Sequence, residues 1–390
     1  MTSHFATRMN HVNDSFIREI LKVTDQPEII SFAGGLPNPQ LFPVEALAEA
    51  ANRVIRDSGR QVLQYSTTEG YLPLREFISE RYQRKEGLTV HPEDILIVNG
   101  SQQGIDLVSK VFLNRGDHVV IERPGYVGAI QAISLYEPEI HMVRLNENGI
   151  DLNNLKSILT RHPVKLMYAV PNFQNPSGIT YTEETREALA ALLTEYSVHL
   201  LEDNPYGDLR FMGTHALPVK NRLGDLGILM GSFSKTAVPG IRLGWVCAEN
   251  TIMKKLKIVK QAADLHSNYL AQRILVEYLE NNAFDDHINI INQAYKSQRD
   301  CMVSEMEAQF PDTVTFTRPE GGMFLWVTLG VHASSSALFE RAIQKKVAFV
   351  PGQAFHLNGE GDRSLRLNYS NASVDQIREG ISRLASAIEG

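Results

Sequence analysis

One lysine lies where its amine could act as a nucleophile. Lys235 follows the apolar run 228–233, which predicts a buried strand. Burial at the edge of a sheet lowers the pKa of a lysine, because a low-dielectric site disfavours the ammonium form. The resulting neutral amine can form an imine with a carbonyl compound. A single lysine after a strand is more often a solvated loop residue, so this chemistry requires partners.

A carboxylate follows another apolar run. Asp203 comes after the run 198–201, where a carboxylate is costly unless it meets a cation or several hydrogen-bond donors. It could pair with a protonated heterocyclic nitrogen, or it could cap the turn that follows.

A third run precedes a turn suited to a phosphate. Gly100 and Ser101 follow the run 95–98 and open a predicted helix. Free backbone N–H groups and a hydroxyl at such a turn can bind a phosphate, although many plain βα turns have the same composition. Arg242, seven residues beyond Lys235, offers a guanidinium for the same anion or for a surface salt bridge.

Seven apolar runs are spaced like the strands of one sheet. Because they alternate with helical patterns and are apolar throughout, they predict a sheet that is covered on both faces. We therefore expect an α/β fold, with a large three-layer domain around a mostly parallel seven-stranded sheet. The expected strands are 95–98, 118–121, 140–145, 166–170, 198–201, 228–233 and 244–247, with helices at 102–113, 183–196 and 251–261.

Unusual polar or aromatic residues follow five of these runs. In open α/β sheets, ligands bind outside the carboxyl ends of the strands, so these residues should meet at one edge. The segments are 99–104, 122–126, 171–178, 202–206 and 234–235. A phosphate cradle, an acid for a ring nitrogen, an imine-forming lysine and aromatic residues for stacking together describe a site for pyridoxal phosphate.

The last third of the chain predicts a smaller α+β domain. Strands are expected at 314–317, 323–327, 347–350 and 365–368, with helices at 336–346 and 374–388. We expect three parts: an N-terminal arm over 1–42, with a helix at 15–23, that packs with the small domain; a large cofactor-binding domain over 43–290; and the small domain over 291–390.

Composition and charge exclude other classes. A formal net charge of −7 argues against a general binder of nucleic acids or anionic membranes, which needs a basic surface. Cys247 and Cys301 are too few for a disulfide framework or a structural zinc site. The 12 histidines are scattered, so no metal site is expected. Without an apolar signal segment or a run near the ~20 residues that span a bilayer, a cytoplasmic protein is expected.

Four motifs, in order, resemble those of class I/II aminotransferases of fold type I, which use pyridoxal 5'-phosphate. They are 171–178 (PNFQNPSG), 203–206 (DNPY), 232–245 (SFSKTAVPGIRLGW) and 366–369 (RLNY). The segments 15–22 (SFIREILK) and 30–37 (ISFAGGLP) are similar to those of the 2-aminoadipate and kynurenine aminotransferase subgroup.

The resemblance implies a role for each matching residue. Lys235 would hold the cofactor as a Schiff base and move a proton, with Asp203 and Tyr206 as the other catalytic residues. Asp203 would keep the ring nitrogen protonated, and Asn175 and Tyr206 would hydrogen-bond the 3-oxygen. Tyr126 would stack on the ring, where the aspartate-aminotransferase branch has Trp. The residues implied around the phosphate are Ser101, Gln102, Ser232, Ser234 and Arg242.

The resemblance also implies substrate contacts and a partner. Arg366 would grip the substrate α-carboxylate, Gly35 and Asn175 would line the substrate, and Arg18 would meet its distal end. Tyr65 would reach the phosphate of a neighbouring subunit, which makes a homodimer with active sites at the interface.

The implied reaction is a ping-pong amino transfer from an amino acid to a 2-oxo acid, with 2-oxoglutarate as the expected acceptor. The donor is open between 2-aminoadipate, an aromatic amino acid, leucine or several of these. A pyridoxal-phosphate-dependent lyase, for β-elimination or decarboxylation, is the alternative on the same fold, because pocket geometry selects the bond that breaks. A third hypothesis is a non-catalytic sensor that binds pyridoxal phosphate, as in some transcription regulators.

Overall fold

The computed structural model of the chain describes residues 4–10, 26–357 and 359–389. The arm helix expected at 15–23 lies outside the described residues. Besides the α-helices and strands given below, there are short 3-10 helices: η1 (Thr7–Asn10), η2 (Pro39–Leu41), η3 (Pro92–Asp94), η4 (Gly224–Leu226), η5 (Pro239–Ile241) and η6 (Gly352–Phe355).

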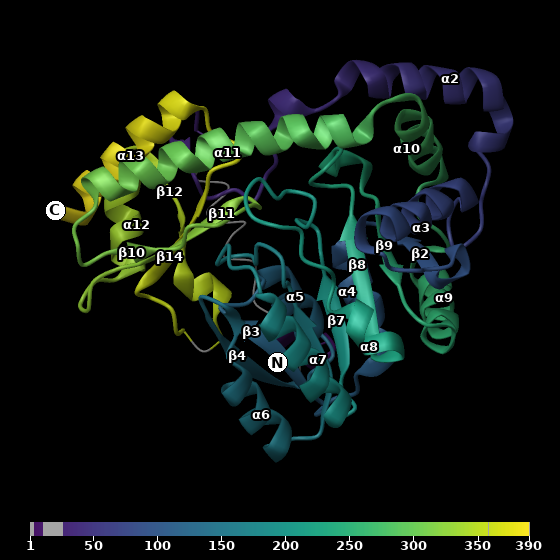
Figure 1. The fold of residues 1–390 in the computed structure, drawn as a ribbon, viewed down its shortest axis with the longest axis horizontal. Coiled ribbons are helices and arrows are strands. Elements are labelled where there is room, and N and C mark those ends of the chain that lie inside the picture. The colour runs from purple at the N-terminus through teal and green to yellow at the C-terminus, as the bar shows by residue number, and fades with distance from the viewer. Residues whose placement is uncertain (1–3, 11–25, 358, 390) are drawn as a thin grey trace.

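The large sheet contains the seven predicted strands and an additional short one. In spatial order they are β2 (Ile95–Val98), β9 (Gly244–Cys247), β8 (Gly227–Ser232), β7 (His199–Asp203), β6 (Val164–Ala169), β3 (His118–Arg123), β4 (Glu139–Asn146) and β5 (Gly149–Ile150). Neighbours from β8 to β4 are parallel, whereas β9 is antiparallel to both β8 and β2. Six strands therefore share one direction, and their carboxyl ends meet at one edge (Figure 1).

Helices cover both faces of this sheet, as the uniformly apolar strands predict. Alternate residues of β3 show the two faces: Val119 belongs to the apolar cluster that includes α4 and α5, and Val120 to the cluster that includes α6 and α7. The helices on the first face are α4 (Ser101–Phe112), α5 (Val127–Ser134) and α9 (Asn250–Asp264). Those on the second are α3 (Leu72–Glu86), α6 (Leu152–Arg161), α7 (Glu183–Glu195), α8 (Lys220–Leu223) and α10 (Tyr269–Asn281), with α2 (Val44–Val62) packed on α10.

A second, smaller sheet lies in the last third of the chain. Its antiparallel strands are, in order, β10 (Thr315–Phe316), β11 (Phe324–Thr328), β14 (Ser364–Asn368) and β13 (Val350–Pro351). It packs with α11 (Phe284–Gln309), α12 (Ser335–Gln344) and α13 (Val374–Glu389). The single strand expected at 347–350 is wrong: Val347 and Ala348 form β12, which pairs with β1 (Ile30–Ser31), and only Val350 and Pro351 pair with β14.

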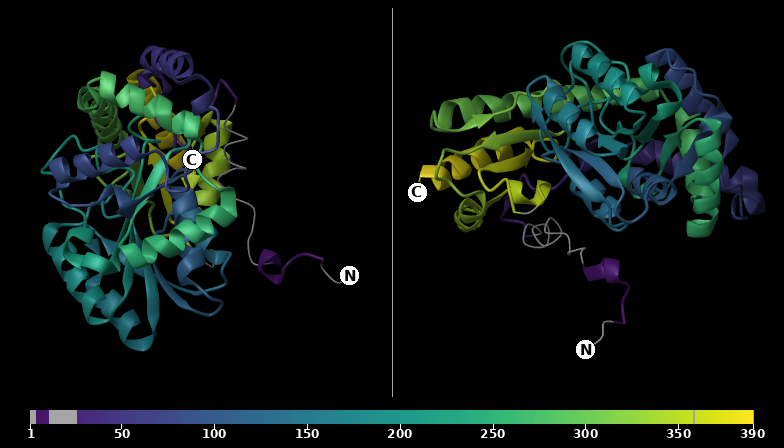
Figure 2. Two further views of the ribbon diagram at one scale, coloured as in Figure 1. Left: turned by 90° about the vertical axis from the view of Figure 1, so that its right-hand side faces the viewer. Right: turned by 90° about the horizontal axis from the view of Figure 1, so that it is seen from below.

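One long helix joins the two parts. α11 begins near α10 and runs beside α13, as both figures show (Figures 1 and 2). The proposed boundary between residues 290 and 291 falls inside this helix. The pairing of β1 with β12 supports the proposal that the arm packs with the small domain. Among the described residues, no helix combines the length and apolarity that a membrane crossing requires.

Candidate active site

One pocket at the carboxyl ends of the strands of the large sheet contains most of the predicted site residues. Its volume is about 460 Å³, within the usual range for a small-molecule site. Twelve of the fourteen predicted residues line it: Gly35, Ser101, Gln102, Tyr126, Asn175, Asp203, Tyr206, Ser232, Ser234, Lys235, Arg242 and Arg366. The convergence expected from the strand ends is therefore present in the fold.

The turn before α4 forms an anion site together with Arg242. Gly100 has a φ of 77°, and a Cβ there would lie 2.6 Å from Arg242 Nη2, so both the backbone and the guanidinium require glycine. Arg242 Nη2 donates to the Asn99 carbonyl at 3.1 Å, and Nη1 lies 3.4 Å from Ser234 Oγ. The Ser101 hydroxyl is buried without a hydrogen-bond partner. The turn, the hydroxyl and the guanidinium suit a phosphate.

The Asp203 carboxylate is buried at the end of β7. It is only 2% exposed, and its Oδ2 accepts a hydrogen bond from the Tyr168 hydroxyl at 2.9 Å. Burial raises the pKa of Asp203 to about 6. Its Oδ1 has no partner at hydrogen-bonding geometry, although the nearby Ser101 hydroxyl lowers the pKa of the carboxyl group. The carboxylate therefore has one oxygen available for a protonated ring nitrogen.

Lys235 lies across the pocket in surroundings that favour the neutral amine. Burial, together with the positive charges of Arg366 and Arg242, lowers the pKa of its ammonium group to about 8. Its Nζ donates to the Gly35 carbonyl at 2.8 Å, which places the predicted substrate-lining glycine beside the amine. The lowered pKa expected from the sequence is present.

Arg366 is held in place on β14, at the small-domain side of the pocket. Its Nη1 donates to Asn175 Oδ1 at 2.9 Å and its Nη2 to the Ala33 carbonyl at 2.6 Å. The guanidinium lies 4.4 Å from the ring centre of Phe324, and its Nε has no partner. Burial lowers the pKa of Arg366 to about 10, so it remains charged at neutral pH and can bind a carboxylate.

Three side chains complete the wall around the ring position. Asn175 Nδ2 lies 3.4 Å from the Tyr206 hydroxyl, so an amide and a phenol converge on one point. Tyr126 also lines the pocket, and its hydroxyl is 3.4 Å from Gln102 Oε1. Gln102 is itself fixed by a 2.7 Å hydrogen bond from its Nε2 to the Gly128 carbonyl. In this pocket, the ring of Tyr126 offers a face for stacking, and the Asn175–Tyr206 pair offers hydrogen-bonding groups for an oxygen at the edge of a ring.

Two of the predicted residues are not in the pocket. Tyr65 is 79% exposed, and its ring packs edge-on against His266 at a centroid distance of 5.8 Å. Arg18 lies outside the described residues, so its predicted contact with the distal end of the substrate stays a prediction.

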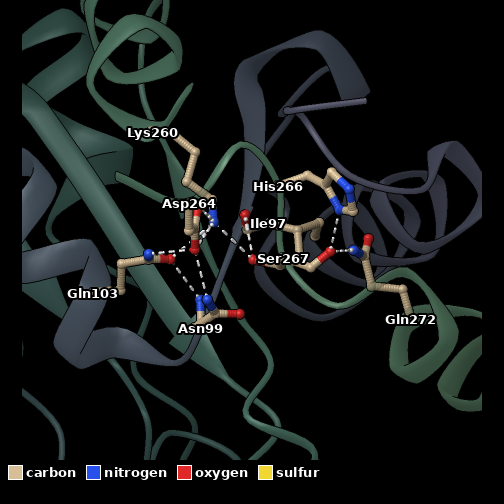
Figure 3. A network of polar contacts seen from close by, with 8 residues as sticks. All are labelled: Ile97, Asn99, Gln103, Lys260, Asp264, His266, Ser267 and Gln272. Carbon is tan, nitrogen blue, oxygen red and sulfur yellow. Dashed lines mark hydrogen bonds and ion pairs between the residues drawn. The ribbon is translucent and has the colours of Figure 1, made fainter. Parts of the chain in front are cut away.

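An ion pair between the buried Lys260 and the partly exposed Asp264 supports the turn before Gly100 (Figure 3). Lys260 is fully buried, and its Nζ binds Asp264 at 2.6 Å. Asp264 Oδ2 accepts from Asn99 Nδ2 and from Gln103 Nε2, both at 2.7 Å. Gln103 Oε1 in turn accepts from the Asn99 N–H at 2.8 Å. The residue before Gly100 is thus fixed through both its backbone and its side chain.

Sequence reasoning missed these supporting residues and Tyr168. Tyr168 lies within an apolar strand, and its only signal was a hydroxyl-bearing residue on the strand next to Asp203. Lys260 and Asp264, four residues apart, look like an ordinary surface pair on a helix. Only the fold shows that the pair is buried next to Asn99.

The residues that line the pocket fit pyridoxal phosphate in the roles expected from the sequence. Within the described chain, the pocket contains three buried polar atoms that lack partners: Ser101 Oγ, Asp203 Oδ1 and Arg366 Nε. Ser101 Oγ could bind a phosphate, Asp203 Oδ1 a ring nitrogen, and Arg366 Nε a carboxylate. Buried polar groups normally find partners, so these atoms indicate that a ligand completes the site.

Comparison with known proteins agrees with this geometry. Residues 28–384 match the family model "Aminotransferase class I and II". The chain is 41% identical to the 2-aminoadipate transaminase of Thermus thermophilus, over 99% of this chain and 96% of that protein. It is 40% identical to aromatic-amino-acid aminotransferase 1 of Thermococcus litoralis, over 99% and 94%. The crystal structure of Pyrococcus horikoshii kynurenine aminotransferase, in complex with PMP, KYN as substrates and KYA as products, has a TM-score of 0.94 at 39% identity, covering 99% and 97% of the chains.

The match extends over almost the whole chain, and the pocket supplies the groups that the cofactor requires. The chain belongs to the class I and II aminotransferases, pyridoxal-phosphate-dependent enzymes of fold type I.

Proposed function

We propose that the enzyme transfers the amino group of 2-aminoadipate, an aromatic amino acid or leucine to 2-oxoglutarate in a ping-pong cycle. The observation that carries the proposal is the shared pocket of Lys235, Asp203 and Arg366. A low-pKa amine, a buried carboxylate and a partly unpaired guanidinium are the groups that amino transfer from an amino acid needs. The relatives named above act on 2-aminoadipate, aromatic amino acids or kynurenine, which supports the donor classes.

When bound, pyridoxal phosphate supplies an aldehyde for the amino group and a ring that accepts the electron pair left on the substrate Cα. Asp203 keeps the ring nitrogen protonated, because its carboxylate lies in a dry site where a cation is strongly favoured. Lys235 would hold the cofactor covalently, and its amine could serve as the base for the Cα proton of a bound amino acid. Its lowered pKa suits that task at neutral pH.

Arg366 selects which bond breaks. A bidentate grip on the α-carboxylate fixes the rotation of the substrate about its Cα–N bond, so that the Cα–H bond stands perpendicular to the ring. Asn175 already accepts from Arg366, which positions the guanidinium before substrate binds. Breaking the Cα–H bond gives amino transfer, whereas other orientations would favour loss of the carboxylate.

The proposal includes a homodimer in the cytoplasm. Tyr65 stands on the surface with its hydroxyl free to reach another molecule, and we propose that it binds the cofactor phosphate of the second subunit. Arg18 is proposed to meet the distal end of the substrate. Tyr65→Phe should then weaken cofactor binding, while Tyr196→Phe, at a partly exposed position away from the pocket, should not.

A donor screen tests the proposed substrates. The purified enzyme is mixed with 2-oxoglutarate and one amino acid at a time, and glutamate formation is measured. We expect turnover with 2-aminoadipate, an aromatic amino acid or leucine above that with aspartate. Formation of pyruvate and ammonia, or of CO₂, in place of glutamate would refute amino transfer to 2-oxoglutarate as the reaction.

A further inference from the structure

Three histidines that are distant in sequence lie together at the edge of the large sheet opposite the pocket. His118 is the first residue of β3, His141 lies in β4, and His162 is the C-cap residue of α6, just before β6. One potential ligand nitrogen from each ring lies within 4.8 Å of the other two. The ring centroids are 4.1 to 5.1 Å apart. The expectation that the histidines are scattered was wrong for these three.

The strand register explains why the side chains meet. His141 is paired with Val120, which lies two residues beyond His118 in β3. Residues two apart in a strand point to the same face, so His118 and His141 share a face of the sheet. This is the face that α6 covers, and α6 ends at His162. All three side chains are half-buried, which leaves them fixed by packing and yet within reach of an ion from solvent.

The three rings lie close enough together for one nitrogen of each to share a single ion. Neutral imidazole nitrogens are the form that binds a metal. One contact already joins two of the rings, with His118 Nδ1 and His141 Nε2 2.9 Å apart.

We propose that His118, His141 and His162 form a binding site for a divalent transition-metal ion, with Zn²⁺ as the ion that best suits three imidazoles. Zinc bonds to histidine nitrogens at about 2.0–2.1 Å in tetrahedral geometry, which requires the nitrogens to be about 3.3 Å apart. The observed spacing brackets this value, so small side-chain rotations close the site. Water takes the fourth position, since the group contains no fourth ligand among the described residues.

The position of the site indicates a structural role. The ligands come from β3, β4 and the end of α6, so one ion would connect three elements that α5 and β5 separate along the chain. The pocket lies at the carboxyl ends of the strands, and this cluster lies near their amino ends. The ion therefore would stabilise the fold without contacting substrate. This inference does not depend on which amino acid the enzyme uses.

The test uses the cofactor-loaded enzyme, first treated with EDTA and then titrated with ZnCl₂ in a calorimeter. We expect one zinc ion per chain, and a rise in Tm of about 3 °C at 100 times the Kd. The variant His118→Ala/His141→Ala/His162→Ala should lose both effects. His332→Ala, at an exposed turn, is the matched control and should keep both. No binding by the native enzyme, or equal binding by the triple variant, would overturn the proposal.

A second measurement covers the case in which the triple variant does not fold. One equivalent of Co²⁺ is added to the EDTA-treated native enzyme, and its visible ligand-field bands are recorded at wavelengths where the cofactor does not absorb. Strong bands typical of four-coordinate cobalt with nitrogen ligands, which His162→Gln weakens, support the site. The weak spectrum of the hydrated ion would show that the three rings form only a hydrogen-bonded stack.

Discussion

Lys235 and Lys260 are both at least partly buried, but the charged residues next to them have opposite effects on an ammonium group. Around Lys235, the charges that act most strongly are those of Arg366 and Arg242, which are also positive. Around Lys260, the Asp264 carboxylate lies 2.6 Å away. The first region favours a neutral, reactive amine, and the second holds a cation that stabilises the phosphate turn. Burial is the largest influence on both lysines and lowers the pKa of each. The neighbouring charges then act in opposite directions, because Arg366 and Arg242 lower the pKa of Lys235 further, whereas Asp264 raises that of Lys260.

The largest expected effect is that of Lys235→Ala. Without the amine, the enzyme loses both the covalent anchor and the base, so amino transfer should fall by about 10⁴-fold. The visible absorbance of the bound cofactor should disappear as well. Rates with the best donor and the absorption spectrum check this result. Lys254→Ala, at an exposed position on α9, should change neither, and an active Lys235→Ala enzyme would contradict the assignment.

Asp203→Asn should act in opposite directions on activity and on stability. Loss of the ring-nitrogen partner should lower the rate by about 10²–10³-fold. Burial raises the pKa of Asp203 from its ordinary value of 3.8 to about 6, so the ionised carboxylate destabilises the cofactor-free protein above pH 6, and this cost vanishes below about pH 4. At pH 8, the cofactor-free variant should therefore be more stable, by about 3 kcal/mol at most.

Urea unfolding of the cofactor-free protein at pH 4 and pH 8 measures the second effect. Asp375→Asn, at a position whose side chain is 93% exposed, is the control and should show no gain. A variant that is equally active, or that is less stable at pH 8, would show that Asp203 is a structural cap.

Lys260→Met should destabilise the fold, because it leaves Asp264 without its cation. We expect the free energy of unfolding to fall by about 2–3 kcal/mol, less than for a fully dry pair because Asp264 is 24% exposed. The Kd for pyridoxal phosphate should rise at the same time, since Asn99 loses its support. Lys110→Met breaks a comparable i,i+4 pair on the surface and should cost about 0.5 kcal/mol or less. If the two variants lost the same free energy of unfolding, the Lys260–Asp264 pair would stabilise the fold no more than a surface pair.

The smallest effect is on the pH dependence of cofactor attachment. With a pKa of about 8, the fraction of neutral Lys235 should rise about fivefold between pH 7 and pH 8. The rate at which the cofactor-free enzyme gains the absorbance of bound pyridoxal phosphate should follow this rise and level off above pH 9. A free lysine derivative should instead keep rising to higher pH. A pH-independent rate would mean that another step controls attachment.

The sequence predicted the parts of the fold and the site that depend on local pattern. The seven runs became strands of the large sheet, because residues such as Val119 and Val120 are buried on both faces. Lys235 and Asp203 could be found because Asp203 ends a buried strand and Lys235 lies three residues beyond the end of another. Their meeting in one pocket then follows from the shared direction of the strands.

What the sequence could not predict depends on register and on packing between distant segments. His118 and His141 lie 23 residues apart, and only the pairing of β3 with β4 brings them together. Lys260 lies on α9, and Asn99 lies in the turn that follows β2. No sequence pattern indicates that Asp264, the partner of Lys260, also contacts Asn99. The reversed direction of β9 was also missed, because a run of apolar residues does not indicate which way a strand runs.

The unbroken course of α11 has a mechanical consequence. Its 26 residues give a rod about 39 Å long. Its first turn is fixed to the large domain by the ion pair of Asp285 with Arg81, and its later turns pack on α13 in the small domain. A tilt of only about 5° at the fixed end would displace the far end by about 3 Å. Because β14 of the small domain carries Arg366, a tilt of α11 relative to the large domain would change the distance between the guanidinium and the amine of Lys235.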